Sequence, residues 1–403
     1  MKSILRSICT LLLAAAAALP VTAEEKIELK WQMWGGNANK AMWEEIASLV
    51  NEKHPNISVK LELSGWSDYW NRLPVLAASG QIGDIIAIQS MRLPRYYPAM
   101  MPLNGLIEKD NFSTEPFESS IIDGLSYEGD QYALPYDLGP WVMFYNADRF
   151  EEAGLELPTP DWTFDDFRAA AKKMTDDDKW GFALQNLDFV TLSVAQGADY
   201  MDKNNEFDVA NAGYRAAVQN IVDLVVKDKV SPLFTSARSD DSARSRFTSG
   251  NAAMMIDGPW IMVGLKDQVD FKMGVATLPS GDKGTRALTA GSGFGISAQT
   301  PHKEAAFKAL KVITGPEAAK ILASAGRALP GRTAEQKYWL NNAADGVLFA
   351  SESLDQAFSN SSPVPINDGW HEFQSLISQY IPLALTEEET VESVLNNIQN
   401  QLP

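Results

Sequence analysis

Tryptophan, amide and carboxylate side chains stand at or just after the ends of several apolar segments of the chain. Trp34, Trp66 and Gln89 follow three segments predicted to be β-strands, and Asp257 and Trp260 follow a fourth. An indole ring can stack on the apolar C–H face of a sugar ring, while carboxylate and amide groups hydrogen-bond hydroxyl groups. This combination favours a site for a neutral, polyhydroxylated ligand.

Further residues of the candidate site come from distant parts of the chain. Asp137 and Trp141 flank the start of an expected strand at 142–145, and Gly291 permits a close approach of the backbone to a ligand. Two roles are open for Arg327: it can bind hydroxyl or anionic groups of the ligand, or it can form a surface salt bridge. One tryptophan at a strand end more often packs than binds, so the prediction rests on several at equivalent positions. The predicted ligand-binding residues are Trp34, Trp66, Gln89, Asp137, Trp141, Asp257, Trp260, Gly291, Ser292, Arg327 and Trp370.

Signatures of metal binding are weak in this sequence. The segment 176–181 resembles a calcium loop, but Trp180 and Leu187 occupy positions that need oxygen ligands. The pair Tyr96-Tyr97 resembles the tyrosines that chelate ferric iron in some exported binding proteins, yet no His or carboxylate cluster accompanies it. The histidines are far apart and lack zinc-site spacing: His54, His302 and His371. We therefore predict no metal ion, no cofactor and no catalytic residue.

Three alternatives to a neutral-carbohydrate receptor remain open. Asp137 and Asp257 can be the carboxylate pair of an exported carbohydrate-active hydrolase, which would hold them roughly 5–5.5 Å apart if retaining or roughly 6.5–9.5 Å apart if inverting. Nucleotide binding is not one of the alternatives, because the glycine-rich run 291–295 matches neither a Walker A loop nor a dinucleotide fingerprint. A receptor for a phosphorylated or sulfonated polyol would use Arg327 or Arg332 as its anion clamp. A polyamine receptor would use the carboxylates.

The N-terminal part of the chain is predicted to form a β-α-β unit. Residues 27–33 and 57–63 alternate apolar with polar side chains, and the apolar residues of 42–50 fall at helical spacing. The two strands of such a unit should be parallel. A helix over 69–79 then leads to the apolar run 84–88, a third, buried strand. This part is therefore α/β.

The remaining pattern continues the alternation of strands and helices. Thr163 caps one expected helix, another covers 214–226, and Thr300 caps a third that has Pro301 at its first position. The last hundred residues are mostly helical. The expected strands are 142–145, 181–183, 252–256, 273–276 and 293–297. The tryptophans assigned to packing are Trp31, Trp43, Trp70, Trp162, Trp180 and Trp339.

The first 23 residues have the pattern of a secretory signal peptide. Lys2 and Arg6 precede an apolar stretch over 8–19, and small residues over 21–23 suit cleavage before Glu24. The stretch is shorter than the ~20 residues of a membrane-spanning helix. We expect an exported, periplasmic protein that is not a lipoprotein.

Cysteine content and charge narrow the function classes further. The single cysteine lies inside the signal sequence, so the mature protein would have no disulfide and no thiol chemistry. Cleavage removes two basic residues and changes the net charge from −18 to −18 − 2 = −20. Such an acidic protein is a poor partner for nucleic acids or anionic membranes. Its 403 residues predict two or three domains.

Seven short segments together resemble the extracellular solute-binding proteins of bacterial ABC importers. The similarity is to their carbohydrate-binding branch, which includes maltose- and glycerol-phosphate-type receptors, and it extends over the mature chain. The segments are Leu134-Pro135-Tyr136-Asp137, Phe144-Tyr145-Asn146, Phe150 to Gly154, Trp162 to Phe167, Phe247 to Met254, Gly258-Pro259-Trp260 and Gly326 to Arg332.

The resemblance implies a two-lobed periplasmic-binding-protein fold with a ligand cleft and a hinge between the lobes. It places the N-terminal lobe at 24–136 plus 290–331 and the C-terminal lobe at 137–289 plus 332–403. The crossings are expected near 135–140, near 287–293 and after Pro330. The function implied is non-enzymatic: a monomeric receptor that closes on a carbohydrate and delivers it to the permease subunits.

The resemblance also assigns roles within the site. Trp260 corresponds to a tryptophan that stacks on the sugar, and Gly291-Ser292 corresponds to a backbone stretch that often meets it. Two positions depart from the pattern of many relatives, which carry Asp where this chain has Gln89 and Gly139. The usual hydroxyl-binding pattern is therefore not expected here, and Trp141 is a candidate to fill the space.

Overall fold

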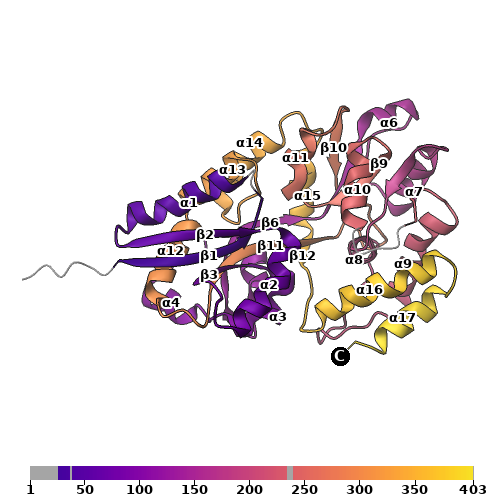
Figure 1. Cartoon of the computed structure of the whole chain (residues 1–403). Coiled ribbons are helices and arrows are strands. Elements are labelled where there is room, and N and C mark those ends of the chain that lie inside the picture. Colours follow the sequence, from indigo (N-terminus) through magenta and orange to yellow (C-terminus); the bar gives the residue numbers. More distant parts are fainter. Residues whose placement is uncertain (1–25, 37–38, 234–238, 403) are drawn as a thin grey trace, which may run out of the picture.

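The computed structural model describes residues 26–36, 39–233 and 239–402, which form two α/β lobes side by side (Figure 1). The expected signal peptide lies outside the described residues. No helix in the described part of the chain is long and apolar enough to cross a membrane.

The first lobe is built on a mixed sheet with the strand order β12-β11-β3-β1-β2, in which β6 also pairs with β11. The expected parallel pairing of the first two strands is confirmed, and β1 also runs parallel to β3. The strands are β1 Ile27–Trp34, β2 Ile57–Ser64, β3 Ile85–Gln89, β6 Ala133–Pro140, β11 Ala287–Ile296 and β12 Ser361–Pro363.

Alternation along β1 explains how this sheet is covered. Leu29, Trp31 and Met33 are fully buried on one face, while on the other face Lys30 is exposed and Gln32 is buried. Helix α1 (Lys40–Lys53) packs Trp43 edge-on against Trp31, at 5.6 Å between ring centroids. Both tryptophans therefore belong to the core, as the sequence predicts.

The second lobe is built on a four-stranded sheet of order β10-β7-β9-β8. Every residue of β7, β9 and β10 is buried, because helices and connecting segments cover both faces, and the strands are accordingly apolar except for Asn146 and Asp257 at the ends of β7 and β9. These strands are β7 Val142–Asn146, β8 Trp180–Ala183, β9 Ala252–Asp257 and β10 Met273–Ala276.

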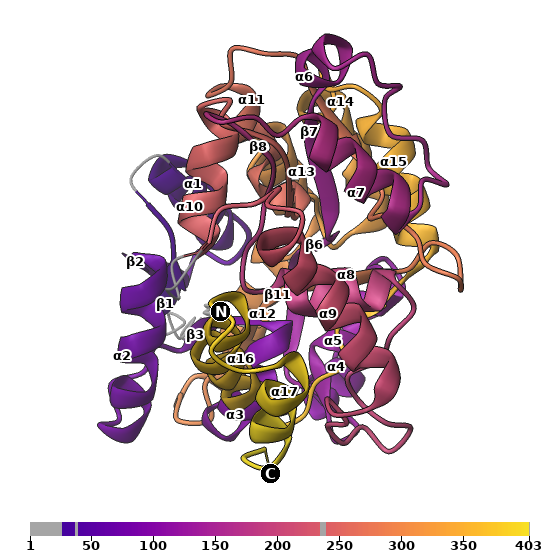
Figure 2. The ribbon, with the colours of Figure 1, turned by 90° about the vertical axis from the view of Figure 1, so that its right-hand side faces the viewer.

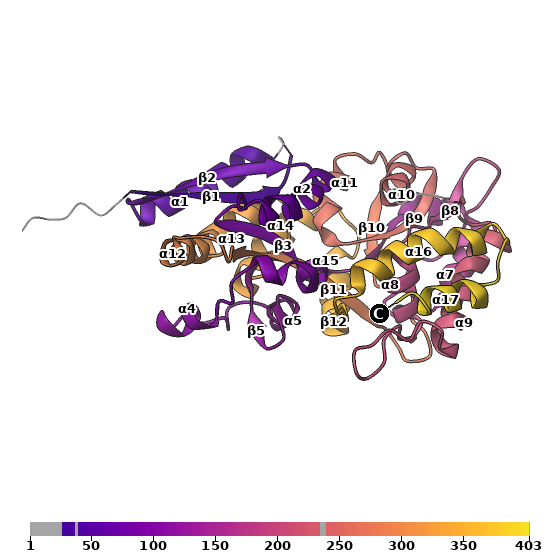
Figure 3. The same ribbon diagram turned by 60° about the horizontal axis from the view of Figure 1, so that its bottom comes forward.

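Two strands carry the chain between the lobes. Leu288 and Ala290 of β11 pack in the core of the second lobe, whereas Phe294 and Ile296 of the same strand pack in the core of the first. The central position of β11 is visible in Figure 3. Strand β6 pairs with β11, and the chain passes directly from β6 into β7 of the other sheet.

The C-terminal helices lie on the second lobe, where α16 and α17 pack beside α9 (Figure 2). The amino end of α16 also contacts the segment after β3 in the first lobe. The helices with eight or more residues are α1, α2 Trp66–Ala78, α7 Phe164–Lys173, α8 Asp188–Ala195, α9 Ala212–Val226, α10 Ser239–Thr248, α12 Lys303–Ile313, α13 Pro316–Ser324, α14 Gln336–Ala343, α15 Ala350–Ser359, α16 Trp370–Leu385 and α17 Val391–Gln399.

Short elements connect the longer ones. They are α3 Leu93–Tyr96, α4 Asn104–Lys109, α5 Ser119–Gly124, α6 Ala147–Glu152, α11 Met262–Lys266, the strands β4 Ser126–Tyr127 and β5 Asp130–Gln131, and the 3-10 turns η2 Ser90–Arg92, η3 Tyr97–Ala99, η4 Pro259–Ile261 and η5 Thr333–Glu335.

Helix capping was predicted correctly in one case and wrongly in another. The expected capping box of α7 is present, since Thr163 and Asp166 exchange hydrogen bonds. Thr300 does not cap α12, which begins at Lys303. Instead its hydroxyl donates to Asp84 at 2.5 Å and accepts the backbone N–H of His302 at 3.1 Å. The residue thus ties the approach to the helix back to the start of β3.

Candidate ligand-binding site

An aromatic cluster forms the wall of the first lobe at the ends of β1 and β2. Trp34 packs edge-on against Trp66, with ring centroids 5.1 Å apart, and also contacts Tyr69 and Trp70. Trp34 is 6% exposed, whereas Trp66 is 45% exposed. The two predicted tryptophans are therefore adjacent, and Trp66 is the one whose ring is available to a ligand.

Arg92 completes this wall and was missed by the sequence analysis. It ends the turn η2 after β3, and its guanidinium lies 4.6 Å from the ring centroid of Trp70 and 5.7 Å from that of Trp66. Its Nε is buried, without a hydrogen-bond partner in the described part of the chain. Burial lowers the pKa of Arg92 from its ordinary value, and so does the charge of Arg95. The available signal was an arginine three residues beyond Gln89.

Four predicted residues meet where β3, β11 and β6 lie side by side. Ser292 of β11 stands opposite Gln89 on one side and opposite Asp137 on the other. A Cβ atom at Gly291 would lie 2.3 Å from the carbonyl oxygen of Asp137, so close strand contact requires glycine there. The structure thus gives Gly291 a packing reason that is independent of any ligand.

Asp137 is a buried carboxyl group at this junction. Desolvation raises its pKa to about 6, and the charge of Arg327 and the backbone N–H of Ser292 partly offset that rise. The side chain of Asp137 is 7% exposed. It therefore lies behind the cleft surface, on a strand that joins the lobes.

The wall of the second lobe is formed by the residues around β9. Trp141 packs edge-on against Trp260, with ring centroids 5.7 Å apart. Trp141 is buried and Trp260 is half-buried. The carboxylate of Asp257 accepts hydrogen bonds from Arg244 Nε and from the backbone N–H of Gly258, each at 2.7 Å. Asp257 is thereby held in an ion pair.

The departure at Gly139 has a steric cause in this chain. A Cβ atom at position 139 would lie 2.4 Å from Cγ of Pro259 and 3.5 Å from the ring of Trp260. Any side chain at this position would push β6 away from η4. The first-lobe strand can touch the second lobe here only because the residue is glycine.

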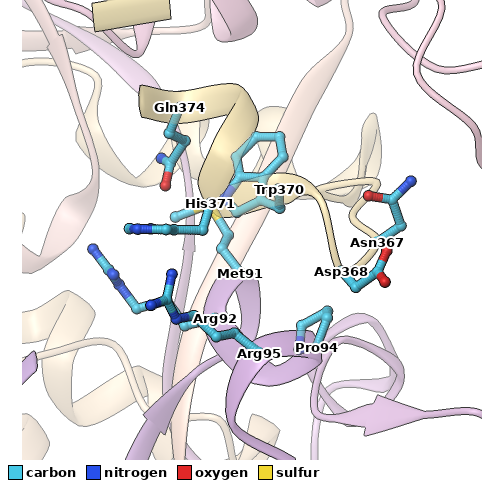
Figure 4. Close-up of a pocket in the computed structure, with 9 residues that line it drawn as sticks. All are labelled: Met91, Arg92, Pro94, Arg95, Asn367, Asp368, Trp370, His371 and Gln374. Carbon is cyan, nitrogen blue, oxygen red and sulfur yellow. The ribbon is translucent and has the colours of Figure 1, made fainter. Parts of the chain in front are cut away.

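A pocket between the lobes contains Trp370, apart from the other predicted residues (Figure 4). It holds about 250 Å³ of space free of protein atoms. Trp370 is 1% exposed and its ring packs near Tyr200 and Phe373, yet the residue lines this pocket. The lining residues are Met91, Arg92, Pro94 and Arg95 from the first lobe, and Asn367, Asp368, Trp370, His371 and Gln374 from the second.

The described residues include no group of three or more His, Cys, Asp or Glu side chains that could hold a metal ion. The groups that the site offers to a ligand are aromatic faces, hydrogen-bonding groups and arginines. Together they can bind a small polar molecule between the two lobes.

Comparisons with known proteins agree on one family and one fold. The model of the bacterial extracellular solute-binding protein family matches residues 35–320. A binding protein of Brucella abortus is 26% identical over 83% of this chain and 82% of its own length. The lactose-binding protein of Rhizobium radiobacter is 27% identical over 64% of this chain and 62% of its own.

The solved structures include an ABC substrate-binding protein of Listeria monocytogenes in complex with cycloalternan. It superimposes with a TM-score of 0.84 at 24% identity and covers 93% of this chain and 98% of its own. This likeness confirms the predicted two-lobed α/β fold.

Proposed function

Because this chain belongs to the bacterial extracellular solute-binding proteins, we propose that it binds a carbohydrate in the cleft between its lobes and delivers it to the permease of an ABC importer. The observation that carries the proposal is a tryptophan cluster on each lobe, Trp66 with Trp34 on the first and Trp260 with Trp141 on the second. Trp66 offers an exposed indole on the first lobe, and Trp260 offers a half-buried one on the second. Sugar rings stack on such faces.

The names of related proteins support a carbohydrate ligand. One relative binds lactose, another is named an arabinooligosaccharide-binding protein, and the Listeria structure holds cycloalternan. Gln89 ends β3 and stands opposite Ser292 of β11, and both residues supply hydrogen-bonding groups for hydroxyls.

Closure of the lobes follows from the way the chain crosses between them. β6 and β11 each contact both lobes, so a change in their backbone angles would move the lobes as bodies. A ligand that contacts both walls binds the closed form more tightly than the open form, and this difference selects the closed form. The permease then recognises the closed form of the protein.

We also propose the finer assignments made from the sequence. The protein is exported to the periplasm with its first 23 residues removed, is not lipidated, and acts as a monomer. The lobes divide at the predicted boundaries, 24–136 plus 290–331 and 137–289 plus 332–403. The candidate ligand-binding residues keep their assignment, with Trp66 and Trp260 as the stacking pair.

The structure disfavours the three alternatives in their original form. Asp257 is committed to Arg244, so a hydrolase would lack a free second carboxylate. The ion pair between Asp257 and Arg244 also weakens the hypothesis of a polyamine receptor, because this carboxylate already has a cationic partner. Arg332 is bound to Glu335 at 3.1 Å, and the charge of Arg327 faces Asp137, so neither arginine is a free anion clamp.

A thermal-shift screen of the protein starting at Glu24 tests the proposal. The panel contains mono- and oligosaccharides, sugar phosphates, polyamines and ferric iron. A ligand at a hundred times its Kd stabilises the native state by ~2.7 kcal/mol, which raises the melting midpoint. A shift with one carbohydrate class, without product on chromatography, supports the receptor. A shift with polyamines or iron alone would reject it.

A further inference from the structure

The pocket lined by Arg92, Arg95 and His371 is basic, although the protein as a whole is acidic. Its lining contains two arginines against one carboxylate, Asp368, together with the imidazole of His371. The whole chain has 52 acidic residues and only 34 Lys and Arg. We call this site the basic pocket. A local excess of positive charge in such a chain calls for an explanation.

The arginines of the basic pocket lack acidic partners within the described residues. Salt bridges occupy Arg168, Arg215, Arg244, Arg286 and Arg332, but none involves Arg92 or Arg95. The buried Nε of Arg92 donates no hydrogen bond to any group in the described part of the chain. A partly buried cation without a counter-ion is costly, so an anion that arrives from outside would be bound favourably there.

The shape of the pocket separates its two kinds of charge. Figure 4 shows Arg92, Arg95 and His371 on one side and Asn367 with Asp368 on the other. Burial lowers the pKa of His371, and the charges of Arg95 and Arg92 lower it further, because the histidine lies near both arginines. Trp66 and Trp70 hold the Arg92 guanidinium by cation–π contact and so fix its position.

The pocket also draws its residues from both lobes. Arg92 and Arg95 belong to the segment after β3, while His371 and Gln374 belong to the first turns of α16. A group bound there would contact both lobes at once. The pocket is small and partly open to solvent, so it can take a single charged substituent of a ligand.

We propose that the basic pocket binds an anionic group of the carbohydrate ligand, a carboxylate or a phosphate monoester, with Arg92 as the principal donor and Arg95 as the second. This proposal rests on the proposed carbohydrate-binding function and specifies the ligand class. Arg92 presents a planar fork of N–H donors that matches either anion. Asn367, Asp368 and Gln374 are placed to bind hydroxyl groups on the same ring.

The test compares matched ligands by calorimetry on the protein starting at Glu24. The probes are D-glucuronate, D-galacturonate and glucose 6-phosphate, each against its neutral parent sugar, together with maltotriose and trigalacturonate. We expect the acidic member of a pair to bind roughly ten- to a hundredfold more tightly, as charged hydrogen bonds allow. Its affinity should fall as salt rises. The uronates and the phosphate distinguish the two sources of charge.

Variants then assign the preference to the pocket. Arg92→Gln should reduce the preference for the acidic ligand to less than about threefold, and Arg95→Gln should reduce it in part. Arg215→Gln is the matched control, because Arg215 pairs with Glu392 on the outer surface of the second lobe. It should leave the preference unchanged. If Arg92→Gln does not fold, the exposed Arg95 and the salt dependence of the wild type decide the result.

The outcomes separate this inference from the function it rests on. Equal binding of acidic and neutral sugars, or a preference that survives Arg92→Gln and Arg95→Gln, overturns the anion subsite and leaves the carbohydrate receptor standing. Binding of neutral sugars alone has the same meaning. Failure of every sugar, with a response to polyamines or iron, overturns both.

Discussion

The two walls of the cleft each contain an arginine, but they balance its charge in opposite ways. In the second lobe, Arg244 Nε donates to Asp257 at 2.7 Å. In the first lobe, Arg92 lies over two indole rings and has no acidic partner in the described part of the chain. A paired arginine fixes the shape of its wall, whereas an unpaired one keeps its charge available to a ligand. The arginine of the second lobe is therefore structural, whereas the arginine of the first lobe is available for recognition.

Tryptophan substitutions in the first-lobe wall should give the largest effect. Trp34 is 6% exposed and contacts three other aromatic rings, so Trp34→Ala should lower the free energy of unfolding by ~3–5 kcal/mol. Trp66→Ala should cost less than about 1 kcal/mol, because nearly half of its side chain is already in water. Urea unfolding measures both changes.

The same pair should reverse its order in carbohydrate binding. Trp66→Ala should weaken binding at least about tenfold, since the exposed ring is the one a sugar can stack on. Calorimetry on the folded variants checks this. Equal stability losses for the two variants would show that Trp66 packs rather than binds.

Asp137 should make stability depend on pH, at the strand that joins the two walls. Its folded pKa of about 6 lies above the value of 3.8 for a free carboxyl group, so the folded state binds the proton more tightly. The stabilisation is fully present below about pH 4 and is lost as the pH rises through 6. The difference corresponds to about 3 kcal/mol. Asp137→Asn should therefore raise stability at pH 7.5 and leave it nearly unchanged at pH 4.

Urea unfolding of wild type and Asp137→Asn at both pH values isolates this group, because other titrating residues cancel in the difference. Asp148→Asn is a suitable control, since the side chain of Asp148 is 40% exposed, its ion pair with Lys272 is long at 4.0 Å, and an amide oxygen can still accept the backbone N–H of Lys272. A constant difference between wild type and Asp137→Asn across the pH range would contradict the assignment.

Periodicity predicted the layers of this fold because each strand and helix buries one contiguous set of apolar residues. Trp31, Trp43 and the parallel pair β1–β2 follow from that rule. The rule failed for Thr300, whose hydroxyl serves Asp84 in a distant strand rather than the nearby helix. Local capping preferences cannot report such a long-range partner.

The sequence could indicate which predicted site residues lie together only where strand register places them. Ser292, Gln89 and Asp137 meet because strand register brings them together. The sequence could not single out Arg92, because this residue is notable for having no acidic partner in the described part of the chain. Only the folded structure shows which arginines are paired. The steric need for glycine at position 139 could not be predicted either, because the residue that a side chain would meet, Pro259, is far away in the sequence.

Removing the charge of Asp257 should change stability less than the ionisation of Asp137 does. It should disturb the wall of the second lobe, where Asp257 pairs with Arg244. Asp257 is 3% exposed, while the Arg244 side chain is 37% exposed and can reach water. Asp257→Asn should therefore cost about 1–2 kcal/mol rather than the full amount for a buried pair. Thermal unfolding of Asp257→Asn beside Arg244→Gln and the double variant measures the coupling. Purely additive losses would mean that the ion pair contributes nothing.

The smallest stability effect should come from Arg92→Gln, and its size is the sharpest test of the comparison. The substitution gives up cation–π contact with Trp66 and Trp70, worth roughly 0.5–2 kcal/mol. It also removes a partly buried charge that has no counter-ion, which offsets that loss. We expect a net change within about 1 kcal/mol in urea unfolding, alongside a large loss of anion preference. A loss as large as that of Asp257→Asn would show that both walls use their arginines for structure, and the division between them would disappear.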